Sequence, residues 1–350
     1  MKRIILSAAV LGAANLCAHA QSNVTIYGIV DTAVRYSTHE NAAGDSKLQM
    51  LGGPLSGSQI GFKGKEDLGG GLSALFSLEN GFSTDNGALL QQTSGSGFTR
   101  LFGREALVGL QGDFGKVTLG RQYALIHNMT ASYDVYAMSN LQPIGWQGGN
   151  YTMGTRLDNS IRYAGTWSGV TATVGYSAGE VTGDIHKKES KGLSIAYDNG
   201  PLHVGGAWQT LNNSTTYFSP AISADSKQTA WTLGGTYTAG PIKWYLAYIN
   251  NKLDIADYRN SSYSAGFKWN ISGPWSLWNA VYFDKLKHAG TSGNRIAIAP
   301  TLDYAFSKRT DVYLTVDYTK LTDAWDTLGS NAGHLYGNRL GVTSGIRHMF

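Results

Sequence analysis

Charged residues are scarce in this sequence: they make up 15% of its 350 residues, whereas soluble domains carry about 25%. There is a single cysteine and there are only 7 prolines, while the 45 glycines follow no Gly-x-y period. These counts exclude a collagen-like chain and a Pro-rich disordered one. The 20 Tyr, 11 Phe and 9 Trp residues are typical of a chain that folds, because aromatic side chains bury large areas.

Residues 1–20 have the pattern of a secretory signal peptide. Lys2 and Arg3 form a basic start, an apolar run follows, and Ala18-His19-Ala20 is an A-x-A cleavage site. The apolar run is shorter than the ~20 residues that a helical bilayer span needs. We therefore expect cleavage after Ala20, export, and a single mature domain over residues 21–350.

The mature chain lacks three further features. Cys17 is lost with the signal peptide, so no disulfide, thiolate metal site or catalytic cysteine can form. Loss of Lys2 and Arg3 lowers the formal net charge from +4 to about +2, which removes the argument for a nucleic-acid partner. No run of 18 apolar residues remains, which excludes a helical membrane protein. The sequence predicts no cofactor and no metal.

Period-two alternation is the main structural signal. In Val24–Tyr36 the even positions are mostly apolar, whereas the odd positions include Asp31 and Arg35. The same pattern recurs in the segments 170–176, 193–197, 242–248 and 312–318. Such strands have one apolar and one polar face. Alternation alone does not decide which face points outward.

The connections between strands fall into two alternating classes. Tight turns, most of them rich in Gly, Asn or Pro, are expected at 67–71, 112–115, 166–169, 198–201, 238–241, 272–274 and 307–310. Longer polar segments lie between them, for example 39–57, 84–99, 123–155 and 211–226. Seven tight turns and eight long loops give sixteen strands. This is the pattern of an all-β transmembrane barrel, antiparallel, with short periplasmic turns and long extracellular loops.

Several segments, in chain order across the mature chain, resemble the trimeric general diffusion porins of Gram-negative bacteria, in the branch common in Neisseria- and Burkholderia-like organisms. These segments are Val24–Gly28, Gly61–Leu72, Leu101–Leu110, Thr118–Gln122, Asp158–Tyr163, Ser307–Thr310 and Gly345–Phe350.

The resemblance implies a sixteen-stranded outer-membrane barrel, a homotrimer packed through the early strands, and a third loop folded inward to narrow each pore. It also implies contact with outer-membrane lipid and lipopolysaccharide. The aromatic C-terminus at Phe350 is similar to the signal that such proteins present to the outer-membrane assembly machinery.

A sixteen-stranded barrel leaves an aqueous channel, so its function depends on the residues at the narrowest point. The segment 123–155 takes the place of the third loop, and Asp134 is its only acidic residue. Counting alternate positions from the outward apolar residues directs a set of basic side chains into the lumen: Arg35, Lys63, Arg104, Arg156 and Arg162. The inward acidic candidates are Asp31, Glu79 and Asp158. The resemblance carries the role of constriction arginine to Arg104 first, with Arg156 beside it.

This balance predicts passive diffusion of ions and small hydrophilic solutes with a mild preference for anions. In the alternative interpretation the arginines only pair with Glu79, Asp134 and Asp158, hold the loop against the wall, and give little selectivity.

The sequence leaves three other functional classes to compare with a general pore. The aromatic third loop, which contains Trp146 and Tyr151, could guide a sugar or an organic acid in a solute-specific channel. A structural or adhesive barrel would act through its loops. An enzyme is disfavoured because no Glu-x-x-His or Gly-x-Ser-x-Gly pattern accompanies the scattered histidines, so no catalytic residue is predicted.

Overall fold

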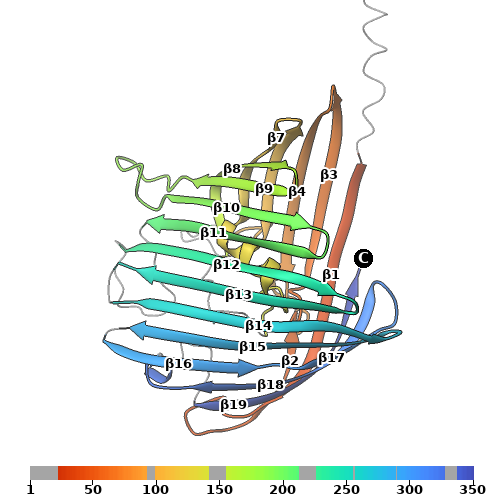
Figure 1. Ribbon diagram of the computed structural model, residues 1–350, viewed down its shortest axis with the longest axis vertical. Helices are drawn as coiled ribbons and strands as arrows, with labels where there is room; N and C mark the ends of the chain where they lie inside the picture. Colours follow the sequence, from red (N-terminus) through yellow and green to blue (C-terminus); the bar gives the residue numbers. More distant parts are fainter. Residues whose placement is uncertain are drawn as a thin grey trace, which may run out of the picture.

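The chain is a closed antiparallel β-barrel in a computed structural model that describes residues 23–92, 99–141, 155–212, 226–254, 257–288, 290–327 and 337–350 (Figure 1). The predicted signal peptide, Trp146 and Tyr151 lie outside these residues. The described part contains nineteen strand segments in one sheet. Three strands are interrupted. β2 and β3 both pair with β1, β5 and β6 both pair with β4, and β16 and β17 both pair with β18, so each of these pairs forms the two halves of one strand. The described residues thus form the sixteen strands that the turn count predicts.

The segments follow one another around the barrel in chain order. They are β1 (Asn23–Ser37), β2 (Lys47–Gly52), β3 (Gln59–Gly69), β4 (Leu72–Phe82), β5 (Leu89–Leu90), β6 (Glu105–Gly112), β7 (Gly115–Tyr123), β8 (Arg156–Trp167), β9 (Val170–Ser177), β10 (Ser190–Asn199), β11 (Leu202–Asn212), β12 (Lys227–Ala239), β13 (Ile242–Leu253), β14 (Arg259–Ser272), β15 (Trp275–His288), β16 (Thr291–Ile298), β17 (Thr301–Ala305), β18 (Thr310–Leu321) and β19 (Asn338–Met349). The described helices are α2 (Leu125–Tyr133) and α3 (Ala324–Thr327). Within the described residues, no helix is both long and apolar enough to cross a bilayer.

All seven predicted tight turns join neighbouring antiparallel strands at one end of the barrel. Gly200, Gly240 and Gly273 occupy three of them with φ between 53° and 58°. Glycine suits these positions because residues with a side chain rarely adopt positive φ. The strand ends that the long connections join lie at the opposite end of the barrel, as the sequence predicts.

The apolar face of each strand points outward. On β18, Leu314, Val316 and Tyr318 are exposed, whereas the intervening Thr315 and Asp317 are buried. This arrangement is the reverse of a soluble sandwich, and it places apolar side chains where lipid surrounds the barrel. The alternation therefore has the orientation that a membrane barrel requires.

The last strand closes the barrel against the first. β19 pairs with β1 from Ile29 opposite Met349 to Ser37 opposite Gly341. Beyond this ladder, Gly28 and Phe350 exchange backbone hydrogen bonds of 3.0 and 3.1 Å. A Cβ atom at position 28 would lie 2.5 Å from the Phe350 ring, so glycine there makes room for the terminal aromatic side chain.

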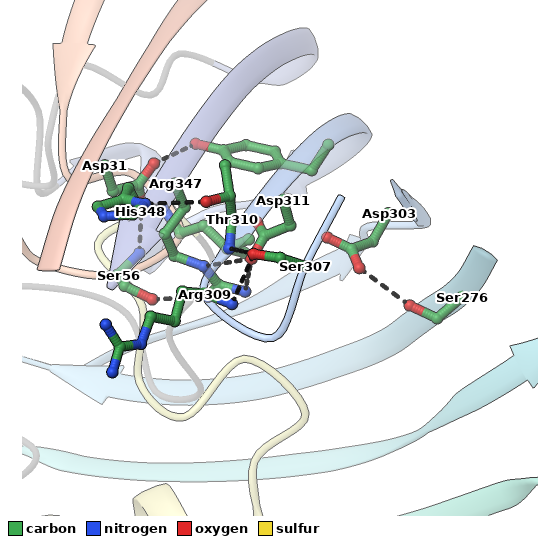
Figure 2. Close-up of polar contacts among 12 residues, drawn as sticks. Asp31, Ser56, Ser276, Asp303, Ser307, Arg309, Thr310, Asp311, Arg347 and His348 are labelled. Atoms are coloured by element: carbon green, nitrogen blue, oxygen red, sulfur yellow. Dashed lines mark hydrogen bonds and ion pairs between the residues drawn. The ribbon is translucent and has the colours of Figure 1, made fainter. Parts of the chain in front are cut away.

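A polar network fastens this seam on the inner side (Figure 2). Asp31 accepts hydrogen bonds from the Tyr313 hydroxyl (2.7 Å) and from the backbone N–H groups of Leu55 (2.8 Å) and Ser56 (2.6 Å). Arg347 donates to Asp311 at 3.0 and 3.1 Å and to the Ser56 hydroxyl at 2.8 Å. Asp31, one of the inward acidic candidates, thus serves to join β1, β18 and the link between β2 and β3.

Candidate functional site

The segment between β7 and β8 folds into the barrel. It begins with α2, which packs against the inner side of β10 to β13 (Figure 1). Tyr133, at the end of α2, occupies a notch in the wall lined by Gly205 and Gly234. A Cβ atom at either glycine would lie within 2.6 Å of the Tyr133 side chain. The wall therefore lacks side chains at the two positions where the tyrosine needs space.

After α2 the segment continues along the wall. Tyr136 places its hydroxyl 2.9 Å from the Thr301 hydroxyl, on β17. Further on, Asn140 donates a 2.8 Å hydrogen bond to the Gly53 carbonyl, and the Leu141 N–H donates a 3.0 Å bond to the Pro54 carbonyl. Residues 124–141 thus run inside the barrel from β7 round to the link between β2 and β3. Residues 142–154 of the predicted loop lie outside the described residues.

Asp134 is a buried anchor of this segment. Its carboxylate accepts a 2.8 Å hydrogen bond from the Tyr282 hydroxyl on β15 and another of 2.8 Å from the Met138 N–H. Burial raises the pKa of Asp134 to about 6, while these hydrogen bonds oppose the shift. Asp134 therefore does not face the arginines with which the alternative interpretation paired it.

Tyr123, at the end of β7, contacts three of the predicted arginines. Its hydroxyl accepts hydrogen bonds from Arg104 Nη2 (2.7 Å) and Arg156 Nη2 (2.6 Å). The guanidinium of Arg156 lies 4.2 Å from the centre of the Tyr123 ring, which adds a cation–π contact. Arg162 donates to the Tyr123 carbonyl oxygen. Three arginines, one directly before β6 and two on β8, therefore meet at one tyrosine, and we call this group the Tyr123 cluster.

Two carboxylates accompany the Tyr123 cluster. Glu79 forms an ion pair with Arg104 and also accepts hydrogen bonds from the Tyr27 hydroxyl (3.1 Å) and Gln59 Nε2 (2.9 Å). Glu105, which sequence reasoning missed, accepts a 2.7 Å bond from the Ser77 hydroxyl. Its position directly after Arg104 was the only signal that could have suggested it.

His127 on α2 stacks on the Tyr123 ring, with ring centres 5.1 Å apart and planes 16° apart. Removal from water lowers the pKa of His127 to about 3, and the nearby guanidinium groups of Arg156 and Arg104 act in the same direction. The imidazole is therefore neutral at physiological pH. The positive charge of the cluster comes from its arginines.

The other predicted site residues lie apart from the Tyr123 cluster. Arg35 is buried and forms a two-pronged ion pair with Asp317, with N–O distances of 2.6 and 2.9 Å. Lys63 places its ammonium 4.8 Å from the centre of the Tyr27 ring. Asp158 is paired with Arg100 and with Arg121, the latter at 2.6 Å. Neither of these two arginines was predicted.

The aromatic side chains at the end of α2 and just after it, within the described part of the segment, pack against the wall. Tyr133 and Tyr136 are almost fully buried against the wall. This burial favours a packing role over an aromatic track for sugars, as far as the described part of the loop extends. Trp146 and Tyr151 fall in its undescribed part.

Comparisons with known proteins agree with this architecture. A family model described as Gram-negative porin matches residues 7–324. Outer membrane porin protein 32 of Delftia acidovorans is 33% identical over 377 residues, and the match covers 100% of both chains. An outer membrane porin protein of Bordetella pertussis is 28% identical over 410 residues, again with 100% of both chains covered.

Solved structures give the same result. The anion-selective porin from Comamonas acidovorans aligns with a TM-score of 0.78 and 30% identity, over 94% of this chain and 100% of that chain. OmpT of Vibrio cholerae, in its trimer form, aligns with a TM-score of 0.68 over 94% of this chain and 99% of that chain. Its sequence identity is 17%, so this second likeness concerns the fold.

Proposed function

The chain belongs to the Gram-negative porin family, and we propose that the arginines of the Tyr123 cluster make its channel prefer anions. It is a β-barrel of the bacterial outer membrane that forms a water-filled channel for passive diffusion of ions and small hydrophilic solutes. The segment 123–155 acts as the constriction loop, and the Tyr123 cluster lines the wall where this loop enters the lumen.

The observation that carries the proposal is the convergence of Arg104 and Arg156 on one hydroxyl oxygen. Together with Arg162, these side chains bring three positive charges to a place where Glu79 and Glu105 supply two negative ones. An excess of arginine in a narrow passage lowers the electrostatic cost for anions and raises it for cations. The effect is mild, because salt screens charges beyond about 8 Å.

The remaining predicted residues contribute less to the anion preference in this proposal, or not at all. Lys63, which lies beside Tyr27, adds positive charge to the wall outside the Tyr123 cluster. Arg35 and Asp158 are neutralised by close partners and serve the structure of the wall. The related Comamonas acidovorans protein is named as anion-selective, which supports the sign of the preference.

The working unit is a homotrimer, and the protein has no enzymatic activity. Family resemblance and the trimer form named for the Vibrio cholerae relative support the oligomer. Phe350 serves as the recognition signal for the outer-membrane assembly machinery, and its exposed ring at the closing seam is accessible for that purpose.

The test is the double variant Arg104→Ala, Arg156→Ala, measured in a planar bilayer under a KCl gradient. The reversal potential should move away from the anion side, because two of the three arginines are gone. Lys308→Ala, which removes an exposed charge from a tight turn, is the matched control and should behave as wild type. Heat-modifiable gel mobility verifies that each variant is folded. A double variant with the wild-type reversal potential would refute the role of these arginines.

A further inference from the structure

Two lysines that no part of the channel account uses face each other on the inner wall. Lys243 on β13 lies directly opposite Lys268 on β14 in the sheet register. Lys243 has the same parity as Ala247 on its strand, and Lys268 has the same parity as Ser264. Ala247 and Ser264 are buried on the inner face, so both lysines point toward the lumen. We call Lys243 and Lys268 the lysine pair.

The lysine pair lies between the folded-in segment and the tight turns. Val135 of that segment packs against Gly266, which is two residues from Lys268 on the same face. A Cβ atom at position 266 would lie 2.7 Å from the Val135 side chain. On the other side of the pair, the strands end at the tight turns 238–241 and 272–274. The lysine pair therefore borders the part of the lumen between the constriction loop and the periplasm.

Aromatic rings hold the cations of this region at the wall. The Lys268 ammonium lies 4.0 Å from the centre of the Trp278 ring, and the Lys243 ammonium lies 5.3 Å from the centre of the Tyr245 ring. The Arg347 guanidinium lies 5.8 Å from the Trp278 ring centre, so it adds a third cation. A cation–π contact attracts a cation through the ring quadrupole and leaves its net charge in place. The rings therefore position the lysine pair without neutralising it.

The carboxylates near the lysine pair have donors of their own. Asp303 on β17 accepts a 3.2 Å hydrogen bond from the Ser276 hydroxyl, and Asp311 on β18 pairs with Arg347 at 3.0 Å (Figure 2). Asp134 is held by the two hydrogen bonds described above. Within the described part of the chain, neither lysine of the pair forms an ion pair with a carboxylate. The two ammonium groups are therefore available to an anion in the lumen.

Two opposed ammonium groups suit an oxyanion with two charges and several oxygen atoms. Like charges in directly opposed positions destabilise a sheet, and the Cβ atoms of such residues lie about 4.5–5.5 Å apart. Both flexible side chains can therefore reach different oxygens of one anion between them. Lysine is a common point-charge donor to phosphate, and a phosphate dianion balances two ammonium groups. A halide ion carries one charge and balances the pair only in part.

We propose that the lysine pair is a phosphate-binding site on the periplasmic side of the constriction loop, for inorganic phosphate or a small phosphate monoester that crosses the channel. Lys243 and Lys268 each donate to phosphate oxygens, and Arg347 adds to the positive potential. The site lies on β13 and β14, apart from the Tyr123 cluster. It therefore does not rest on the anion preference assigned to that cluster.

The test is inhibition of the chloride current of the full barrel in a planar bilayer, at pH 8 and a fixed KCl concentration. The probes are inorganic phosphate, glucose 6-phosphate and glucose, and the readout is the concentration that gives half of the maximal drop in chloride conductance. The test variant is Lys243→Gln, Lys268→Gln. The control variant, Lys116→Gln, Lys308→Gln, removes two exposed lysines at the same end of the barrel.

The proposal predicts that half-inhibition of the test variant needs about tenfold or more phosphate than wild type, because two charged donors to the phosphate oxygens are lost. The control variant should respond as wild type does. In wild type, inhibition by both phosphate compounds assigns the phosphate group in either form, and inhibition by inorganic phosphate alone assigns the free ion. Glucose should have no effect.

An equal response of the test variant and wild type, or a wild type that glucose inhibits as strongly as glucose 6-phosphate does, would each overturn the proposal. Lys243→Gln alone changes an exposed side chain and should raise the half-inhibition concentration in the same direction, so the proposal stays testable if the double variant fails to fold. The reversal-potential test of Arg104 and Arg156 uses no phosphate and other residues. Failure of either test therefore leaves the other intact.

Discussion

Tyr282 on β15 donates a 2.8 Å hydrogen bond to Asp134, and so ties the inward-folded segment to a wall strand far away in sequence. Asp134 is the only carboxylate in the segment 123–155, and it is fully buried. The loop therefore uses its one acidic residue for attachment, which leaves the arginines of the Tyr123 cluster without a carboxylate from the loop.

This relationship predicts that Tyr282→Phe destabilises the barrel, whereas Tyr133→Phe does not. Loss of the Tyr282 hydroxyl leaves a buried carboxylate short of a donor, at a cost of about 1–3 kcal/mol. The Tyr133 hydroxyl is buried without a hydrogen-bond partner among the described residues, so its removal should be neutral or stabilising. Urea unfolding in detergent micelles compares the two variants. Equal losses of stability would contradict this account of the loop anchors.

The pH dependence of loop attachment follows from Asp134 and His127, which act in opposite directions. Burial raises the pKa of Asp134 from 3.8 to about 6, so its titration stabilises the docked loop at low pH, and that stabilisation is lost as pH rises through 6. The pKa of His127 falls from 6.5 to about 3, so its contribution is present above 6.5 and is lost as pH falls toward 3. The two effects largely offset each other between pH 4 and 6.

Single substitutions should therefore show the effects of Asp134 and His127 separately. In Asp134→Asn only His127 titrates, and hydrogen-exchange protection of α2 should fall on going from pH 7 to pH 4.5. In His127→Gln only Asp134 titrates, and protection should rise over the same pH interval. The change is roughly tenfold for each unit by which the pKa of the titrating group differs between the docked and the undocked loop. Exchange is followed by mass spectrometry with correction for intrinsic rates. A shift of the same sign in both variants would show that other groups control the loop.

The buried pair of Arg35 and Asp317 yields a third prediction. Arg35→Met alone should cost roughly 3–5 kcal/mol of unfolding free energy, because it leaves Asp317 as an uncompensated buried charge. The double variant Arg35→Met, Asp317→Leu should recover much of that loss. Conductance should change little in the double variant, because Arg35 lies apart from the Tyr123 cluster. Equilibrium unfolding of both variants tests the pair, and a double variant no more stable than the single one would contradict it.

Most of the barrel could be predicted from the sequence, because turns and alternation are local signals. Six of the seven tight turns carry their own Gly, Asn or Pro residues, and the parity of each strand assigns its faces. The interruptions were missed. The break between β16 and β17 falls beside Pro300, whose missing N–H cannot join the ladder, so this one had a visible signal.

The candidate site was harder to predict, because parity gives the face of a residue but not its position along the barrel. Arg35 and Arg104 were placed together on parity, yet they have separate partners. Bulges add a second difficulty. Asn159 has φ 53° and Gly120 has φ 124°, with a register shift between β7 and β8. An extra residue reverses the faces beyond it, and the pairing of Asp158 with Arg100 and Arg121 could not be inferred by counting.

The most direct test of the central claim is the zero-current potential of the wild-type protein in a planar bilayer that separates two KCl concentrations. If the channel prefers anions, the potential must have the sign set by chloride diffusion. If the protein is a trimer, each insertion should also add conductance in three equal steps. A potential with the sign set by potassium would contradict the account, because the arginines around Tyr123 would then not determine which ions pass.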